Sequence, residues 1–287
     1  MAAALPALET LSEHASFGGV QGFYRHASRT IGLPMKFGVY RPPQALAGHP
    51  VPALVWLAGL TSTEETFAIK AGAQRVASEL GLMLVTPDTS PRDTGTPGAD
   101  DHWDFGHGAG FYVDARRAPW AAHWRMESYV TRELPEVIAA NFRWRGDALG
   151  IFGHSMGGHG ALTLALRHPG MFRSVSAFAP VAAPTQCPWG VKAFANYLGD
   201  DLATWAAHDA TELVKSGARA PALLVDQGLS DQFLAEQLNI DRFEAACRSA
   251  GQSLTLRRHE GYDHGYYFIA SFVEDHLRFH ADSLKDG

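Results

Sequence analysis

The residues of this sequence best suited to chemistry are a serine, a histidine and an aspartate that lie far apart along the chain. The serine, Ser155, is the centre of the segment from Gly153 to Gly157, which fits the pattern G-x-S-x-G. The pattern alone is common, but here a buried-strand run precedes it and an Ala- and Leu-rich helical run follows. A sharp strand-to-helix turn of this kind presents a nucleophile. We therefore predict that Ser155 is a nucleophile and that the main-chain N–H of Met156 points to the oxyanion. The alternative is a Gly-rich structural turn in a Rossmann-like fold.

His264 is the predicted general base among the 14 histidines. Serine hydrolases of the α/β class order their catalytic residues as nucleophile, acid and histidine, with the last two on loops after later strands. His264 lies in a Gly-flanked loop between the last predicted strand and the final helix, from which it could reach Ser155. His259 is the alternative, but it falls at the end of a predicted strand. His154 and His159 are too close to the serine in sequence and are expected to pack around it.

Two aspartates compete for the role of the acid that orients the histidine. Asp226 ends a predicted strand, whereas Asp231 follows a Gly-containing turn at the start of a predicted helix. At that place a carboxylate can accept a hydrogen bond from the imidazole and also cap the helix. We predict Asp231 as the acid and Asp226 as a structural residue that holds the loop.

The elements that must position these residues alternate between short apolar runs and helical patterns. The predicted strands span residues 51–57, 82–86, 148–152, 175–178, 222–226 and 254–258, and the predicted helices span 68–80, 126–141, 158–168 and 231–250. Such alternation is typical of crossover units that build a mostly parallel sheet. Residues 18–40 alternate apolar and polar types and predict antiparallel strands. The predicted fold class is α/β, an α/β-hydrolase fold with a mostly parallel central sheet flanked by helices.

Two long segments, 88–119 and 179–207, are predicted as loops, and long loops inside a compact domain are usually functional. The first contains His102, Asp104 and His107, which are suitable types of metal ligand. Their spacing matches no known ligand set. We expect this loop to be packed by its own hydrogen bonds, with a metal site as the less favoured alternative.

Composition narrows the class of protein. The chain has 287 residues, of which 46% are hydrophobic and 19% charged, so we expect one globular α/β-hydrolase domain spanning 1–287. A net charge of -6 with dispersed Lys and Arg argues against nucleic acid as a partner. The two cysteines are too few for a disulfide framework and favour a reducing compartment.

The N-terminus lacks the features of a secretory signal, and no segment is long and apolar enough for a membrane span. We expect a cytoplasmic protein.

Several longer segments resemble the S-formylglutathione hydrolase (esterase D) family. They are Leu57 to Phe67, Trp103 to Ala115, Gly153 to Leu162, Cys187 to Phe194, Asp226 to Leu234 and Tyr262 to Ile269, with Phe17-Gly-Gly near the N-terminus. The Trp-Asp-Phe-Gly and Cys-Pro-Trp-Gly segments are far more specific than G-x-S-x-G. The resemblance covers the chain from about Phe17 to the last helix.

The resemblance implies hydrolysis of the thioester S-formylglutathione to formate and glutathione, the closing step of glutathione-dependent formaldehyde detoxification. It implies Ser155, Asp231 and His264 as catalytic residues, a homodimer, and no metal or organic cofactor. It also implies the main-chain N–H of Leu60 as the second oxyanion donor. The alternative for Leu60 is a plain core residue, and both interpretations can hold together. The family commonly has Cys after Gly-Leu-Thr, where this sequence has Ser62. We expect Ser62 to remove sensitivity to thiol reagents.

The substrate contacts are the least specific part of the prediction. Trp189 and Lys192, in the second long loop, are candidates for binding the glutathione portion, because Lys could meet a carboxylate. A packed Trp and a solvated Lys are the alternative. A general carboxylesterase for short acyl or aryl esters would use the same catalytic residues. A further alternative is an inactive hydrolase fold used as a binding module, against which the presence of all three catalytic types argues.

Overall fold

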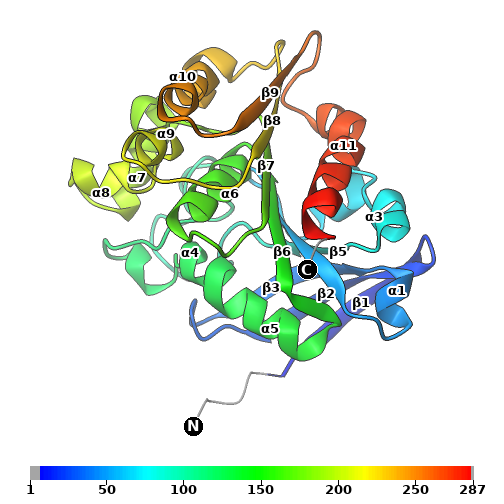
Figure 1. Ribbon diagram of the computed structural model, residues 1–287. Coiled ribbons are helices and arrows are strands. Elements are labelled where there is room, and N and C mark those ends of the chain that lie inside the picture. Colours follow the sequence, from blue (N-terminus) through cyan, green and yellow to red (C-terminus); the bar gives the residue numbers. More distant parts are fainter. Residues whose placement is uncertain (1–6, 286–287) are drawn as a thin grey trace.

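A computed structural model describes residues 7–285 and shows one twisted sheet with helices on both faces (Figure 1). The nine strands follow the order β1-β2-β3-β5-β4-β6-β7-β8-β9. Their bounds are β1 Glu9–Ser16, β2 Gly19–Ala27, β3 Pro34–Arg41, β4 Val51–Leu57, β5 Met83–Pro87, β6 Trp144–His154, β7 Ser174–Phe178, β8 Leu223–Gly228 and β9 Leu254–His259. The start of the chain, on which the expected lack of a secretory signal rests, lies outside the described residues.

The sheet is parallel from β5 through β4 and β6 to β9, while β1, β2 and β3 pair antiparallel at its N-terminal side. All residues of β5, β7 and β8 are buried, because helices cover both faces of these strands. Apolar residues at successive positions, such as Leu223 to Val225 in β8, are the sequence sign of burial on both faces. The predicted fold class is confirmed.

The helices form a layer on each face of the sheet. Their bounds are α1 Pro43–Leu46, α2 Thr66–Lys70, α3 Gln74–Leu80, α4 Met126–Ser128, α5 Leu134–Asn141, α6 Met156–Arg167, α7 Pro188–Tyr197, α8 Leu202–Ala206, α9 Ala210–Lys215, α10 Ile240–Ala250 and α11 Tyr266–Leu284. Figure 1 shows α6 and α11 on opposite faces. Strand β6 accordingly alternates, with Ile151 in the core beneath α6 and Phe152 in the core beneath α11.

The six strands predicted in the parallel region are confirmed, as is the antiparallel portion within 18–40. The predicted helix 68–80 is wrong as one element, because Gly72, with a φ of 69°, separates α2 from α3. The predicted helix 231–250 is also wrong at its start. A short π-helical turn at Leu234–Leu238 ends at Asn239, with a φ of 54°, and α10 begins only after it.

The two long segments predicted as loops differ in structure. Residues 88–119 contain no α-helix and only isolated bridges between short stretches. Residues 179–207 carry α7 and α8, so the prediction of a loop there is wrong. Asp201 caps α8 by accepting a hydrogen bond from the Ala203 amide at 3.0 Å, and Pro188 stands in the first turn of α7. Both are local helix-start signals.

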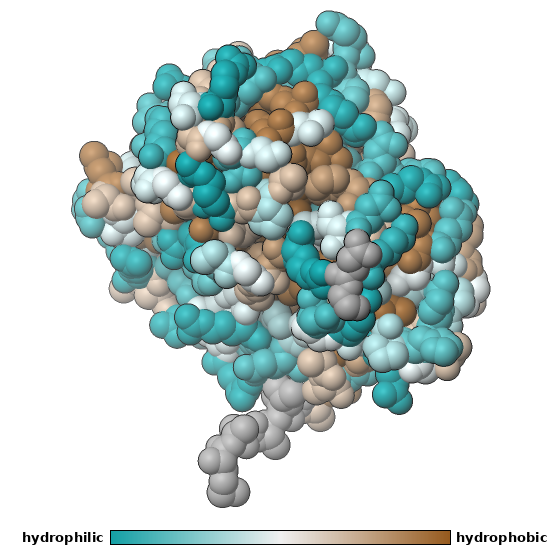
Figure 2. Space-filling model, viewed as in Figure 1, coloured by the Kyte–Doolittle hydropathy of each residue, from teal (hydrophilic) through white to brown (hydrophobic). Residues whose placement is uncertain are grey.

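The outer surface is polar, with apolar residues gathered in separate patches on the face shown in Figure 2. The longest helix within residues 7–285 is α11, with 19 residues. None of the helices in that part of the chain combines the length and apolar character that spanning a bilayer requires.

Candidate active site

Ser155 occupies the turn between β6, which ends at His154, and α6, which begins at Met156. Its backbone has a φ of 57° and a ψ of -118°, a strained conformation for a residue other than Gly. The turn brings α6 so close to β4 that a Cβ on Gly157 would lie 1.9 Å from the carbonyl oxygen of Leu57. The second Gly of G-x-S-x-G is therefore required by this close approach. The turn presents the serine side chain to a pocket at the end of the parallel sheet, although Ser155 as a whole is only 5% exposed.

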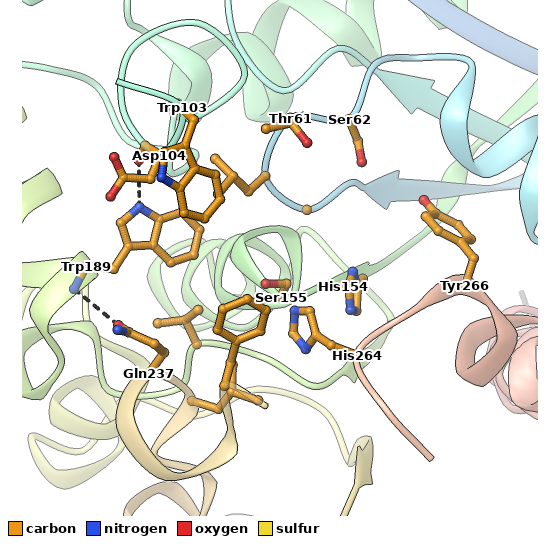
Figure 3. A pocket seen from close by; sticks show the side chains of 15 residues that line it. Thr61, Ser62, Trp103, Asp104, His154, Ser155, Trp189, Gln237, His264 and Tyr266 are labelled. Carbon is orange, nitrogen blue, oxygen red and sulfur yellow. Dashed lines mark hydrogen bonds between the residues drawn. The ribbon is translucent and has the colours of Figure 1, made fainter. Parts of the chain in front are cut away.

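Ser155 faces a pocket of about 340 Å³ in which aromatic and apolar side chains predominate (Figure 3). Its lining residues come from the segments after β4, β6, β7, β8 and β9 and from the loop 88–119. They are Gly59, Leu60, Thr61, Ser62, Trp103, Asp104, His154, Ser155, Val181, Trp189, Phe233, Gln237, Leu238, His264 and Tyr266. The carboxyl ends of parallel strands are the usual place for such a site.

His264 and Asp231 meet at the edge of this pocket, from the loops after β9 and β8. The imidazole Nδ1 lies 2.5 Å from Asp231 Oδ2. The other carboxylate oxygen, Oδ1, accepts a hydrogen bond from the Phe233 amide at 2.8 Å. Asp231 therefore caps the turn that follows it and not α10. Since an ionised carboxylate only accepts, Nδ1 donates to it and Nε2 is left as the acceptor of the ring.

The structure brings Ser155, His264 and Asp231 to one end of the sheet, and it forms one of the two expected hydrogen bonds. Ser155 and His264 line the same pocket, but within residues 7–285 no hydrogen bond joins the serine hydroxyl to the imidazole. Hydrogen bonds between nucleophile and base are often long in the absence of substrate and tighten in its complex.

His154 and His159 are buried neighbours of the site. The His154 ring centroid lies 4.4 Å from that of His264, and burial lowers the pKa of His154 well below its usual value. Burial likewise lowers the pKa of His159 to about 4. Both imidazoles are therefore neutral at pH 7 and pack around the serine turn.

Asp226, the rejected alternative for the acid, is fully buried and already paired. Arg257 donates to its two oxygens from Nε and Nη2, each at 2.6 Å. Burial would raise its pKa, but His276 and Arg257 outweigh burial and lower the pKa to about 2. His259 stacks on Phe272 with a centroid distance of 3.8 Å. These residues join β8, β9 and α11 behind the site.

Two main-chain amides are the candidate oxyanion donors. Met156 is the first residue of α6, and the first amides of a helix have no acceptor within it. Leu60 lines the pocket, and a Cβ on its neighbour Gly59 would lie 3.3 Å from Ser155 Cβ. The two amides therefore belong to segments that meet at the serine.

Trp189 and Lys192 have different environments, although both lie on α7. Trp189 lines the pocket and donates from Nε1 to the main-chain oxygen of Asp104 at 2.7 Å. Lys192 Nζ is bound to Asp104 Oδ1 at 2.6 Å, so its charge is already met by a carboxylate. Among the described residues that line the pocket there is neither Lys nor Arg.

Several pocket residues were missed by sequence reasoning. Trp103 and Tyr266 lay within segments that carried the family resemblance, which is a signal that could have found them. The same holds for Phe233, in the segment Asp226 to Leu234. Gln237 gave no such signal, because it lies outside those segments and reaches the pocket only through the short turn before α10.

The loop with the potential metal ligands is held by its own hydrogen bonds. His107 Nδ1 lies 2.7 Å from Asp100 Oδ1, and His107 Nε2 lies 3.1 Å from Thr94 Oγ1. Asp104 is engaged by Lys192. In the described part of the chain, no group of three or more His, Cys, Asp or Glu side chains is arranged to hold a metal ion.

Comparisons with known proteins agree with this architecture over nearly the whole chain. The Esterase family model matches residues 28–279. An S-formylglutathione hydrolase from Mus musculus is 53% identical over 282 residues, which cover 97% of this chain and 99% of that protein. One from Paracoccus denitrificans is 52% identical, with the same two coverages.

A solved structure gives the same result in three dimensions. The S-formylglutathione hydrolase from Agrobacterium tumefaciens superposes with a TM-score of 0.94 at 48% identity, covering 96% of this chain and 99% of that one. The chain therefore belongs to the Esterase family and, within it, to the S-formylglutathione hydrolases.

Proposed function

We propose that this protein is a serine thioesterase that hydrolyses S-formylglutathione to formate and glutathione, with Ser155, His264 and Asp231 as its catalytic residues. The observation that carries the proposal is that Ser155 and His264 line one pocket and that Asp231 is hydrogen-bonded to His264, in a chain 53% identical to an S-formylglutathione hydrolase. The hydrogen bond between His264 and Asp231 supports the assignment of base and acid.

The proposed mechanism uses each of these groups in turn. Ser155 Oγ attacks the formyl carbon while His264 Nε2 takes the hydroxyl proton. The carbonyl oxygen becomes an oxyanion, for which the N–H groups of Leu60 and Met156 are the proposed hydrogen-bond donors. The C–S bond then breaks, and His264 gives its proton to the departing thiolate of glutathione. Water repeats the cycle on the formyl-enzyme and releases formate.

The pocket supports recognition of the acyl group and the thiol more than recognition of the carboxylates of glutathione. Its walls are aromatic and apolar, and Lys192 is paired with Asp104. Trp189 and Trp103 are the proposed contacts for the peptide portion of glutathione. Lys192 has an indirect role, because it binds Asp104, which lines the pocket. The same walls would accept short acyl or aryl esters, which keeps a general carboxylesterase as the second candidate.

Steady-state assays separate the two candidates. We expect kcat/KM for S-formylglutathione to exceed that for S-acetylglutathione, S-lactoylglutathione and nitrophenyl acetate by at least about tenfold. Similar values for all four substrates would favour the general carboxylesterase. No turnover of any substrate would favour an inactive fold used for binding.

Matched variants test the catalytic assignments. Ser155→Ala and Asp231→Asn should each lower kcat by about 10³- to 10⁴-fold, because they remove the nucleophile and the group that fixes the imidazole tautomer. Asp263→Asn is the control, since Asp263 is an exposed neighbour of His264 whose carboxylate, within residues 7–285, bonds only the Gly265 amide, at 2.8 Å. It should keep nearly full activity. Activity of Ser155→Ala close to wild type would refute the mechanism.

We further propose one domain spanning 1–287, a homodimer and a cytoplasmic location. The single sheet that runs from β1 to β9 supports one domain. The two buried, unpaired cysteines, Cys187 and Cys247, support a reducing compartment. Sedimentation equilibrium tests the dimer, which the family resemblance suggests.

A further inference from the structure

Arg92, in the long loop 88–119, does not line the pocket but contacts Ser62, which does. We propose that Arg92 is a positioning residue for the oxyanion site: by holding the carbonyl oxygen of Ser62, it fixes the peptide group that carries the Leu60 N–H. This inference rests on the proposed function, because it assigns the oxyanion role to Leu60. The loop 88–119 then positions a group of the active site in addition to packing on itself.

The segment after β4 contains a backbone conformation that must be stabilised by contacts from outside the segment. Thr61 has a φ of 65°, a left-handed conformation that is strongly unfavourable for a β-branched residue. Such a conformation persists only where the surroundings impose it. The Thr61 amide donates to the carbonyl oxygen of Gly108 at 3.0 Å. This is the first of the hydrogen bonds by which the loop 88–119 stabilises the segment.

The loop 88–119 also forms hydrogen bonds with Ser62. Its carbonyl oxygen accepts two hydrogen bonds, from Arg92 Nη2 at 3.0 Å and from Thr89 Oγ1 at 2.8 Å. Its amide donates to the carbonyl oxygen of Gly59 at 3.2 Å. The Gly59 carbonyl and the Leu60 N–H belong to one planar peptide group, so fixing the first fixes the direction of the second. A path of hydrogen bonds and main-chain bonds through Ser62 therefore connects Arg92 to the Leu60 N–H.

Arg92 is itself held rigidly. Its Nη2 lies 2.7 Å from Asp88 Oδ1, and its Nε lies 3.1 Å from both oxygens of that carboxylate. The Asp88 side chain is 4% exposed and that of Arg92 33%. The planar guanidinium can thus serve the carboxylate and the Ser62 carbonyl at once, and a charged donor makes a stronger hydrogen bond than a neutral one.

An oxyanion donor acts on the transition state and scarcely on bound substrate, which sets the kinetic signature of this role. Arg92→Gln should lower kcat about 30-fold and change KM less than twofold, on both S-formylglutathione and nitrophenyl acetate. Arg92→Lys should recover only part of the loss, because an ammonium cannot bind both partners in the same plane.

Arg258→Gln is the matched control. Arg258 has a similar side-chain exposure, 34%, and is likewise paired with acids, Asp241 and Glu244, but lies on β9 away from the pocket. It should leave kcat unchanged. A folded Arg92→Gln protein with the kcat of this control, or with a raised KM and unchanged kcat, would overturn the proposal.

Thr89 gives a milder test that does not depend on the stability of the Arg92 variant. Thr89→Val removes one donor to the Ser62 carbonyl and should lower kcat about fivefold, whereas Thr89→Ser keeps the hydroxyl and should restore it. Equal kcat values for these two variants would also overturn the proposal.

The labelling of Ser155 by a fluorophosphonate ester keeps this inference separate from the proposed substrate. The phosphonyl oxygen occupies the oxyanion site whatever the natural substrate is, so the labelling rate of Arg92→Gln should fall with its kcat. If wild type does not hydrolyse S-formylglutathione, the proposed function fails while this measurement still decides the role of Arg92. An unchanged labelling rate would contradict it.

Discussion

At the scale of single residues, the position of Ser62 decides how the site responds to thiol chemistry. Ser62 lines the pocket, while the two cysteines of the chain are each 1% exposed. Burial raises the pKa of Cys187 to about 11 and that of Cys247 likewise to about 11. The reactive thiolate is therefore scarcely populated at pH 7, and neither sulfur is accessible to reagents.

We predict that N-ethylmaleimide leaves wild-type activity intact and inactivates Ser62→Cys at least about tenfold faster, because only the variant has an accessible thiol in the pocket. Residual activity against time, with mass spectrometry of the modified peptide, measures this. A substrate or product in the pocket should slow the inactivation of Ser62→Cys. Rapid loss of wild-type activity with modification at Cys187 would contradict the prediction.

The role of a residue could be predicted where a sequence motif or the order of residues along the chain indicates its partners. Ser155 carries its own motif, and the order of nucleophile, acid and base pointed to Asp231 and His264. Lys192 could not be predicted in the same way. Its partner Asp104 is 88 residues away in a loop without regular structure, so nothing local indicated that its charge is already paired.

At the scale of elements, the β6–α6 turn depends on contact between α6 and β4. The absence of a side chain at Gly157 lets the helix approach the Leu57 carbonyl. A main-chain oxygen of a central strand cannot move aside as the tip of a flexible side chain can. The strained turn that presents Ser155 is thus maintained by packing within the sheet layer.

Gly157→Ala should therefore lower the free energy of unfolding by about 3 kcal/mol and reduce activity, because the new methyl group would overlap the Leu57 oxygen. Gly146→Ala is the control, since Gly146 lies in β6 with no heavy atom within 4 Å of an added Cβ. It should stay within about 0.5 kcal/mol of wild type. Urea unfolding of the three proteins measures both values, and equal stabilities would show that the turn relaxes easily.

Elements were predictable where burial gives them a clear pattern. The buried strands β4 to β8 were recognised because both faces need apolar residues. Strand β1 was missed, since it is exposed along almost its whole length and shows no alternation. The helix predicted over 231–250 failed for another reason. Asn239 adopts a left-handed conformation that separates the pocket-lining turn from α10, and sequence periodicity does not reveal such a break.

At the scale of the whole molecule, buried histidines link stability to pH. Burial lowers the pKa of six of them: His26, His154, His159, His208, His276 and His280. They come from both faces of the sheet and from widely separated parts of the chain. Each is neutral in the folded protein near pH 7. In the unfolded chain each would bind a proton as the pH falls below its usual value of 6.5.

The folded protein should therefore lose stability as the pH falls from 7 to 5. The sign follows from the lowered folded pKa, because the unfolded state binds more protons in this range and mass action favours it. His159 and His208, with folded pKa values of about 4 and about 3, should each contribute a loss of about 2 kcal/mol between pH 7 and pH 5. Urea unfolding at the two pH values measures the sum.

His208→Gln should reduce the pH dependence by about 2 kcal/mol, whereas His49→Gln, at an exposed position, should not change it. If His208→Gln kept the wild-type pH dependence, His208 would have to titrate equally in the folded and unfolded states, contrary to its burial among Phe194, Trp205 and Glu127.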